Sequence, residues 1–172
     1  MRVLLIDDHT LVRKGLEQLL QSRGVEIAAS VSNGQEGIAQ ALALKPDIVL
    51  LDMKMPDMNG TETLKQLRAA GVAAPILMLT MSRDEQDLQA ALRNGAQGYL
   101  LKDMDPEDLV PALQDAMLGN NVVAKELIGS LTRLVQGRSG RSAAKTTSTD
   151  LLADLTPREL EILRHVAEGE SN

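Results

Sequence analysis

The first 120 residues alternate between two hydrophobic patterns. Short apolar runs rich in Val, Ile and Leu are separated by stretches in which apolar residues return at helical spacing. Runs this short and this apolar predict strands that are buried on both faces of a sheet. The five runs are Val3–Ile6, Ile27–Val31, Ile48–Leu51, Ile76–Leu79 and Tyr99–Leu101.

The stretches between and after these runs predict five helices. Gly24 can end the first helix. Ser82 and Glu85 form a capping-box pattern, which predicts that the fourth helix is capped by Ser82. Asp105 before Pro106 predicts the start of the fifth, with an N-cap oxygen ahead of a proline in the first turn. The apolar positions that share a helix face are Leu11, Val12, Leu16, Leu19 and Leu20; Ile38, Ala41, Leu42 and Leu44; Leu64 and Leu67; Leu88, Ala91 and Leu92; and Leu109, Leu113, Ala116 and Met117.

Five strands that alternate with five helices predict an α/β fold, a doubly wound parallel sheet with helices on both faces. We assign residues 1–120 to this domain. We interpret residues 121–150 as a linker helix followed by a flexible basic linker, because residues 137–149 are small and polar, with three cations and no acid. The apolar face of the linker helix comprises Leu127, Ile128, Leu131, Leu134 and Val135.

Residues 151–172 predict the start of a second folded unit. Thr156 and Glu159 form a capping box, with Pro157 at the first helical position and Leu160 and Leu163 on the helix that follows. A single helix of about a dozen residues cannot bury a core by itself. We therefore expect the chain to stop inside its second domain.

Composition and charge narrow the function classes. Residues 1–120 carry 11 Lys and Arg against 17 Asp and Glu, and the remainder carries 7 of each, so a nucleic-acid contact is expected only from the C-terminal part. There is no cysteine, which excludes disulfides and thiol nucleophiles. No apolar run approaches the roughly 18 residues of a membrane span. Asp7 and Asp8 follow the first apolar run at once, which argues against a signal peptide and favours the cytoplasm.

Polar side chains follow four of the predicted strands. Asp7 and Asp8 follow the first strand, Asp52 the third, Thr80 the fourth and Lys102 the fifth. The carboxyl ends of parallel strands are where open α/β sheets build their sites. Carboxylates that converge there repel one another and need a cation, and all-oxygen ligands suit Mg²⁺. A carboxylate beside Mg²⁺, with a lysine and a hydroxyl across the pocket, is equipped for phosphoryl transfer.

At these residues the sequence resembles the response-regulator receiver family, over about the first 120 residues. The matching motifs are Asp7-Asp8, the segment from Asp52 to Gly60, Leu79-Thr80 and the segment from Gly98 to Lys102. The resemblance implies the flavodoxin-like strand order 2-1-3-4-5 and a sensor histidine kinase as the phosphoryl donor. It implies an output controlled by phosphorylation rather than a turnover enzyme.

The resemblance also implies a role for each matched residue. Asp52 is then the phosphoacceptor, Lys102 pairs with the phosphoryl group, Thr80 hydrogen-bonds it and Tyr99 is an aromatic switch. The implied Mg²⁺ ligands are Asp7, Asp8, Asp52 and the backbone carbonyl of Lys54.

The segment Leu155–Leu163 resembles the opening of a LuxR-type helix-turn-helix domain, and with the receiver motifs it points to the NarL/FixJ subfamily of transcription regulators. Two departures qualify this. Asp103 follows Lys102 where the family usually has proline, and the recognition helix is absent, so DNA binding is assigned only to a longer parent protein. Phosphorylation is expected to change the contact between receiver and effector domain or to expose a surface for a homodimer.

Some residues near the predicted site also fit a plainer structural interpretation. Tyr99 fits a half-buried strand aromatic as well as a switch, and His9 fits an exposed first-turn residue better than a modulator of the pocket. Met53, Met55 and Met58 fit loop packing better than a ligand set.

Three other functions remain as alternatives. A phosphatase of the haloacid-dehalogenase type would need an Asp-x-Asp pattern after the first strand, and Asp7-Asp8-His9-Thr10 lacks it. A nucleotide-binding module would need a glycine-rich phosphate loop, and the sequence has none of the usual patterns. A receiver that acts only through protein contacts is the third.

Overall fold

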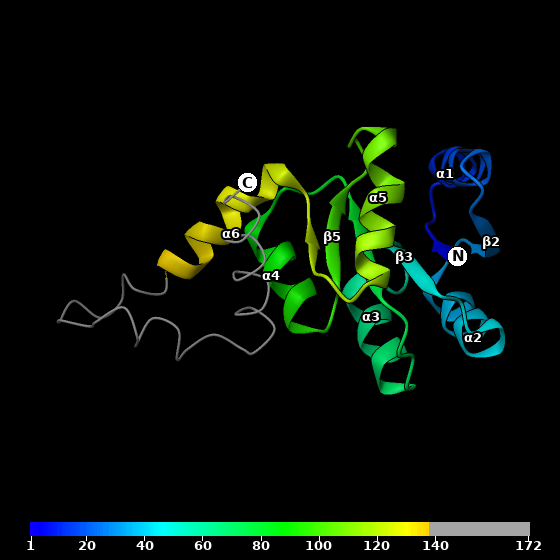
Figure 1. Ribbon diagram of the computed structural model, residues 1–172. Helices are drawn as coiled ribbons and strands as arrows, with labels where there is room; N and C mark the ends of the chain where they lie inside the picture. The colour runs from blue at the N-terminus through cyan, green and yellow to red at the C-terminus, as the bar shows by residue number, and fades with distance from the viewer. Residues whose placement is uncertain (138–172) are drawn as a thin grey trace.

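The computed structural model describes residues 1–137 as a parallel sheet with helices on both faces (Figure 1). The strands are β1 (Arg2–Ile6), β2 (Glu26–Val31), β3 (Ile48–Asp52), β4 (Ile76–Thr80), β5 (Gly98–Leu101) and β6 (Val122–Val123). The helices are α1 (Thr10–Ser22), α2 (Gly34–Leu44), α3 (Gly60–Ala69), α4 (Glu85–Arg93), α5 (Pro106–Met117) and α6 (Lys125–Gly137). The basic linker predicted after Gly137 and the unit predicted at residues 151–172 lie outside the described residues.

The sheet has the order β2-β1-β3-β4-β5-β6, and every neighbouring pair is parallel. The predicted order of the first five strands is therefore confirmed. The sequence analysis missed β6, a two-residue strand that pairs with β5 through Gly98↔Val122 and Tyr99↔Val123. Its signal was hidden because two valines are too few to form a recognisable apolar run.

Two hydrophobic cores lie on opposite faces of this sheet, because alternate residues of a strand point to opposite sides. On one face Leu5, Leu50 and Leu79 pack with α1 and α5. On the other, Leu51 and Met78 pack with residues of α2, α3 and α4. The four strands β1, β3, β4 and β5 are buried almost throughout, as predicted. The edge strand β2 is only partly buried, so the prediction of burial on both faces was wrong there.

Of the two helix N-caps predicted from the sequence, that of α5 is confirmed and that of α4 is wrong. Asp105 caps α5, and its carboxylate accepts a hydrogen bond from the N–H of Glu107 at 3.0 Å. The capping box predicted at Ser82 does not form. Asp84 caps α4 instead, through the N–H of Gln86 at 2.8 Å, and the Ser82 hydroxyl donates to Asp87. Asp84 is as good an N-cap residue as serine, and it lies directly before the helix.

The helix predicted as a linker, α6, packs against α4 on the side of the molecule away from α1 (Figure 1). Leu127 is buried in the same core as Tyr99. The guanidinium of Arg133 lies 2.7 Å from the carboxylate of Glu85 on α4. The first turns of this helix therefore pack against the domain predicted at residues 1–120. Within residues 1–137, no helix is both long and apolar enough to cross a bilayer.

Gly60 begins α3 in a position that admits no side chain. A Cβ added there would lie 2.1 Å from the carbonyl oxygen of Asp52 and 2.7 Å from the Cα of Met53. The N–H of Gly60 donates to the Met53 carbonyl at 2.9 Å, which closes the loop after β3 onto itself. The glycine therefore lets the start of α3 rest directly on the backbone that carries Asp52.

We predict that Gly60→Ala lowers the free energy of unfolding by roughly 1–3 kcal/mol, because backbone atoms cannot move aside as a flexible side chain can. Gly15→Ala is the matched control. Gly15 lies inside α1 with open space around it, so alanine there should stabilise by up to about 1 kcal/mol. Urea unfolding of both variants measures the difference. Equal stability changes in the two variants would contradict the close approach at Gly60.

Candidate functional site

The strand order brings the predicted site residues to one edge of the sheet. Asp7 and Asp8 follow β1, Asp52 ends β3, Thr80 ends β4 and Lys102 follows β5. Since β1, β3, β4 and β5 are consecutive neighbours, their carboxyl ends lie side by side. The predicted convergence of carboxylates, hydroxyl and lysine is confirmed.

A buried ion-pair cluster forms the centre of this edge. The Nζ of Lys102 lies 2.7 Å from Oδ2 of Asp7 and 3.0 Å from Oδ2 of Asp52. The side chain of Lys102 is 6% exposed, and those of the two aspartates are nearly as buried. Lys102 is therefore buried inside the site and is not a solvated surface lysine. One ammonium shared by two carboxylates leaves a net negative charge in a site with little water.

His9 joins the cluster from the N-cap position of α1. Its Nδ1 lies 3.1 Å from Asp8, 3.3 Å from Asp7 and 3.6 Å from Asp52, measured to the nearest carboxylate oxygen. The ring is 59% exposed, which agrees with the interpretation as a first-turn residue, yet one nitrogen faces the carboxylates. The sequence signal was its place directly after the aspartate pair.

Three buried carboxylate oxygens of the cluster make no hydrogen bond of good geometry and have only the close nitrogens of Lys102 or His9 as partners: Asp7 Oδ2, Asp52 Oδ2 and Asp8 Oδ1. Ligand atoms of these residues and of His9 lie within 4.8 Å of one another. Buried polar atoms of one charge need a partner. Oxygen donors in this number and spacing fit a hard divalent cation, and Asp7, Asp8 and Asp52 are the residues that could hold it.

Lys54 lies at the rim of the site rather than inside it. Its N–H donates to Oδ1 of Asp52 at 3.3 Å, and its side chain is exposed. This bond orients the Asp52 carboxylate. The role predicted for the Lys54 carbonyl, as a further metal ligand, stays a prediction.

Thr80 and Tyr99 are linked through the turn after β4. The buried Thr80 hydroxyl accepts a hydrogen bond from the Ser82 N–H at 3.0 Å. The hydroxyl of Tyr99 donates to the Ser82 carbonyl at 3.3 Å. Tyr99 is fully buried rather than half-buried, and burial raises the pKa of its phenol to about 12. The Tyr99 hydroxyl therefore stays protonated and tied to the Thr80 turn.

Burial raises the pKa of the Asp52 carboxyl above its ordinary value, although the ammonium of Lys102 opposes this rise. The neighbouring charge of Asp7 acts in the same direction as burial. The ionised carboxylate is thus held in an unfavourable environment, where its lone pairs are poorly solvated.

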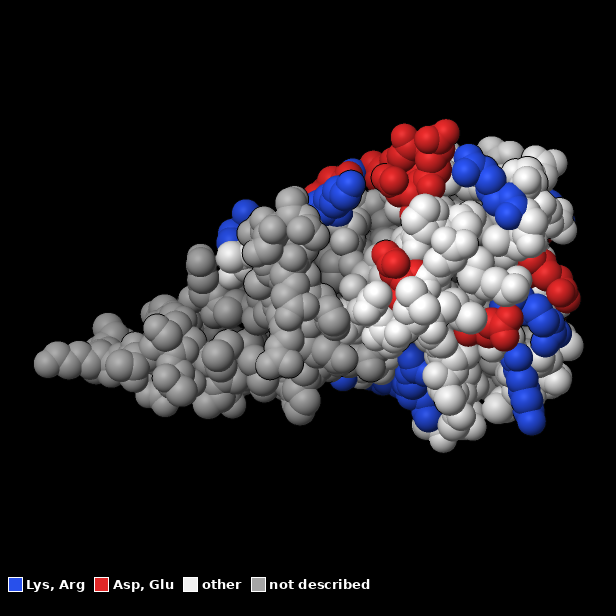
Figure 2. Space-filling model, viewed as in Figure 1, with Lys and Arg blue, Asp and Glu red and all other residues white. Residues whose placement is uncertain are grey.

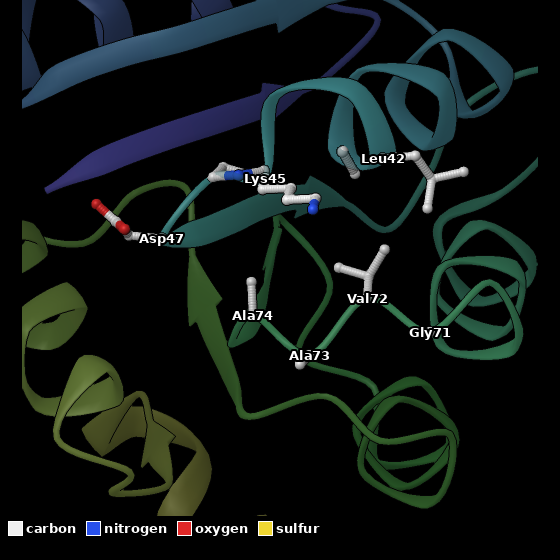
Figure 3. A pocket seen from close by; sticks show the side chains of 9 residues that line it. Leu42, Lys45, Asp47, Gly71, Val72, Ala73 and Ala74 are labelled. Carbon is white, nitrogen blue, oxygen red and sulfur yellow. The ribbon is translucent and has the colours of Figure 1, made fainter.

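A cavity lies at the amino ends of the strands, away from the carboxylate cluster (Figure 3). This cavity of about 340 Å³ opens between the end of α2 and the loop before β4, near the amino ends of β3 and β4. Its walls are mainly apolar, including Leu42, Val72 and Ala74, with Lys45 and Asp47 as the ionisable side chains. The polar residues that could carry phosphoryl chemistry converge at the opposite edge of the sheet, so this hollow is not the candidate site.

Charged side chains of both signs are interspersed on the face shown in Figure 2. No continuous basic surface spreads over the described residues on that face. The excess of acidic residues in the first 120 positions agrees with this view. This face is therefore a poor surface for the phosphates of nucleic acid.

Comparison with known proteins places these residues in a family context. A family profile described as the response regulator receiver domain matches residues 3–114. The nitrate/nitrite response regulator protein NarL of Escherichia coli (strain K12) is 43% identical over 171 residues, which cover 99% of this chain and 76% of that protein. The transcriptional regulatory protein LnrK of Bacillus subtilis (strain 168) is 36% identical over 173 residues, which cover 99% of this chain and 79% of that protein.

A solved structure gives the same result. The crystal structure of a two-component response regulator of the LuxR family from Aurantimonas sp. SI85-9A1 superposes with a TM-score of 0.73 at 29% identity. It covers 80% of this chain and 97% of that chain.

We predict that Asp52→Asn stabilises the fold in metal-free buffer by on the order of 1 kcal/mol at neutral pH. The wild-type carboxyl has a raised pKa in the folded state, so its ionisation costs stability above that pKa, while Lys102 keeps Asp7 as a partner in the variant. As pH falls through the folded-state pKa, the carboxyl becomes protonated and the difference shrinks. Urea unfolding across this range measures it, and a variant less stable than wild type at neutral pH would contradict the prediction.

Proposed function

The chain belongs to the response regulator receiver family and is homologous to the NarL-type transcription regulators of two-component systems, and we propose that it accepts a phosphoryl group on Asp52 and thereby switches a DNA-binding output. The observation that carries this proposal is the buried cluster in which Lys102 contacts both Asp7 and Asp52. A carboxylate that can act as nucleophile, one ammonium and an excess of buried carboxylate oxygens meet there at the carboxyl edge of the sheet.

The chemistry follows from the placement of each group. An oxygen of Asp52 attacks the phosphorus of a phosphohistidine on a sensor histidine kinase, the P–N bond breaks, and the imidazole leaves with a proton. Lys102 neutralises charge on the phosphoryl oxygens. The Thr80 hydroxyl, at the end of β4, would donate a hydrogen bond to one of them. A Mg²⁺ ion held by Asp7, Asp8 and Asp52 would supply the further positive charge that phosphoryl transfer requires.

The proposed role is that of a self-modifying switch rather than a turnover enzyme. The acceptor is a side chain of the protein, so each molecule is modified once and stays modified until the acyl phosphate hydrolyses. A phosphatase of the haloacid-dehalogenase type is less well supported, because its nucleophile should lie in an Asp-x-Asp pattern after the first strand. Asp7-Asp8-His9, which follows β1, lacks that pattern.

The output would run from the β4–α4 connection toward α6. The Thr80 turn is tied to Tyr99 and to α4, and α4 packs against α6, which leads to the residues after 137. DNA binding is proposed for the C-terminal part of the full-length protein, and a homodimer is one form that the phosphorylated state could take.

Incubation with acetyl phosphate and Mg²⁺ should add one phosphoryl group to the wild-type chain, detected by intact-mass spectrometry. Asp52→Asn should remain unmodified. Asp57→Asn is the matched control, because Asp57 is exposed in the loop after β3 and has a positive φ that asparagine tolerates. Modification of the Asp52→Asn protein, or none of the wild type, would refute the proposal.

Mg²⁺ should raise the melting temperature of the wild-type chain, since a ligand that binds only the folded state adds about 2.7 kcal/mol at a hundredfold excess over Kd. Asp8→Asn should lose most of this shift, because it removes one of the three carboxylates. Thermal melts with Mg²⁺ and with EDTA compare the two proteins. Equal shifts in wild type and variant would mean that Asp8 is not a ligand.

A further inference from the structure

We propose that Arg83 and Asp103 are positioning residues for phosphoryl transfer, and this rests on the proposed function of Asp52. Their ion pair ties together the two loops that carry Thr80 and Lys102. An Nη2 atom of Arg83 lies 2.6 Å from Oδ2 of Asp103, across 20 residues of chain. The pair thus fixes how far apart the hydroxyl and the ammonium stand at the mouth of the site.

The two loops are already joined once at their bases. The N–H of Lys102 donates to the carbonyl of Thr80 at 2.8 Å, where β4 and β5 end. Beyond that bond each loop turns away toward its own helix, α4 or α5. The Arg83–Asp103 pair closes the loops a second time, three residues past Thr80 and one past Lys102. Two tethers restrict a hinge motion that one tether permits.

The residue before Arg83 is the one that orients the Thr80 hydroxyl. Ser82 donates its N–H to Thr80 and accepts a hydrogen bond from Tyr99 on its carbonyl. Holding Arg83 therefore holds the backbone on which the Thr80 hydroxyl depends. Asp103 directly follows Lys102 in the chain, so holding Asp103 in place also restrains the backbone that carries Lys102.

Both side chains respond to the contact. The hydrogen bond and charge of Asp103 raise the pKa of Arg83, and Arg83 lowers the pKa of the Asp103 carboxyl. The pair lies at the surface, with exposed fractions of 52% and 42% for the two side chains. An exposed pair is weak and screened by salt. We therefore expect a modest, salt-sensitive effect on the reaction.

If the two residues acted only through their charges, the expected effect of losing Asp103 would have the opposite sign from that of a positioning role. Acetyl phosphate is an anion, so loss of the positive Arg83 should slow its reaction, whereas loss of the negative Asp103 should speed it. A positioning role predicts that losing either partner slows the reaction, because both losses break the same tether. The sign of the Asp103 effect therefore separates the two explanations.

The test is a double-mutant cycle on Arg83→Gln, Asp103→Asn, the combination, and the charge swap Arg83→Asp with Asp103→Arg. The rate of Asp52 phosphorylation by acetyl phosphate with excess Mg²⁺ is followed by intact mass at ionic strengths of about 0.1 M and about 1 M, where the Debye length is roughly 10 Å and 3 Å. Glu26→Gln is the matched control, because it breaks the exposed Arg2–Glu26 pair at the far edge of the sheet.

At the lower ionic strength, both single variants should react roughly two- to fivefold more slowly than wild type. The double variant should be no slower than either single one, the swap should recover most of the rate, and the differences should fade at high salt. An accelerated Asp103→Asn protein, or unchanged rates in both single variants, would overturn the proposal. A wild type that takes up no phosphoryl group would refute the proposed function itself, which is a different outcome.

Discussion

The fold is organised around an unfavourable arrangement, three carboxylates gathered at the carboxyl edge of a sheet and met there by the ammonium of Lys102. Two of the carboxylates, Asp7 and Asp52, are buried and share that ammonium. The cost is visible in the raised pKa of Asp52 and in the buried oxygens that lack hydrogen bonds. The surrounding backbone is built to hold this arrangement. Gly60 allows α3 to start against the Asp52 backbone, and the N–H of Lys54 orients the carboxylate.

The same edge is mechanically connected to the far end of the receiver. Ser82 holds the Thr80 hydroxyl with its N–H, receives the Tyr99 hydroxyl on its carbonyl and donates its own hydroxyl to α4. Tyr99 in turn shares a core with Leu127 of α6. A change of charge at Asp52 that moves Thr80 must therefore break or carry along bonds that reach α4 and α6. Packed elements of this kind shift between discrete arrangements rather than deforming smoothly.

The sequence alone located strands and site residues correctly where a strong local pattern agreed with the overall fold. Apolar runs located β1, β3, β4 and β5, and the polar residues that follow them located Asp7, Asp52, Thr80 and Lys102. It was insufficient where tertiary contacts decide. Nothing local distinguishes Ser82 from Asp84 as the cap of α4, since both are good N-cap residues. The packing of α6 on α4 depends on Arg133 and Glu85, which are 48 residues apart. His9 lies near Asp52 as well as Asp7 and Asp8 only because β1 and β3 are neighbours in the sheet.

The charge balance of the site also explains why a switch built from these residues would need a cation from solution. Lys102 now serves two carboxylates at once. If Asp52 becomes an acyl phosphate, it exchanges one negative charge for nearly two on the phosphoryl oxygens, and these oxygens extend further from the strand. A single ammonium that follows them can no longer stay close to Asp7. Asp7 would then lose its ammonium partner while it stays buried, with only the His9 ring and backbone N–H beside its carboxylate. Buried carboxylates without a partner are strongly unfavourable. In the proposed phosphorylated state a divalent cation beside Asp7 and Asp8 would offset this loss, so we expect phosphorylation and metal binding to favour each other.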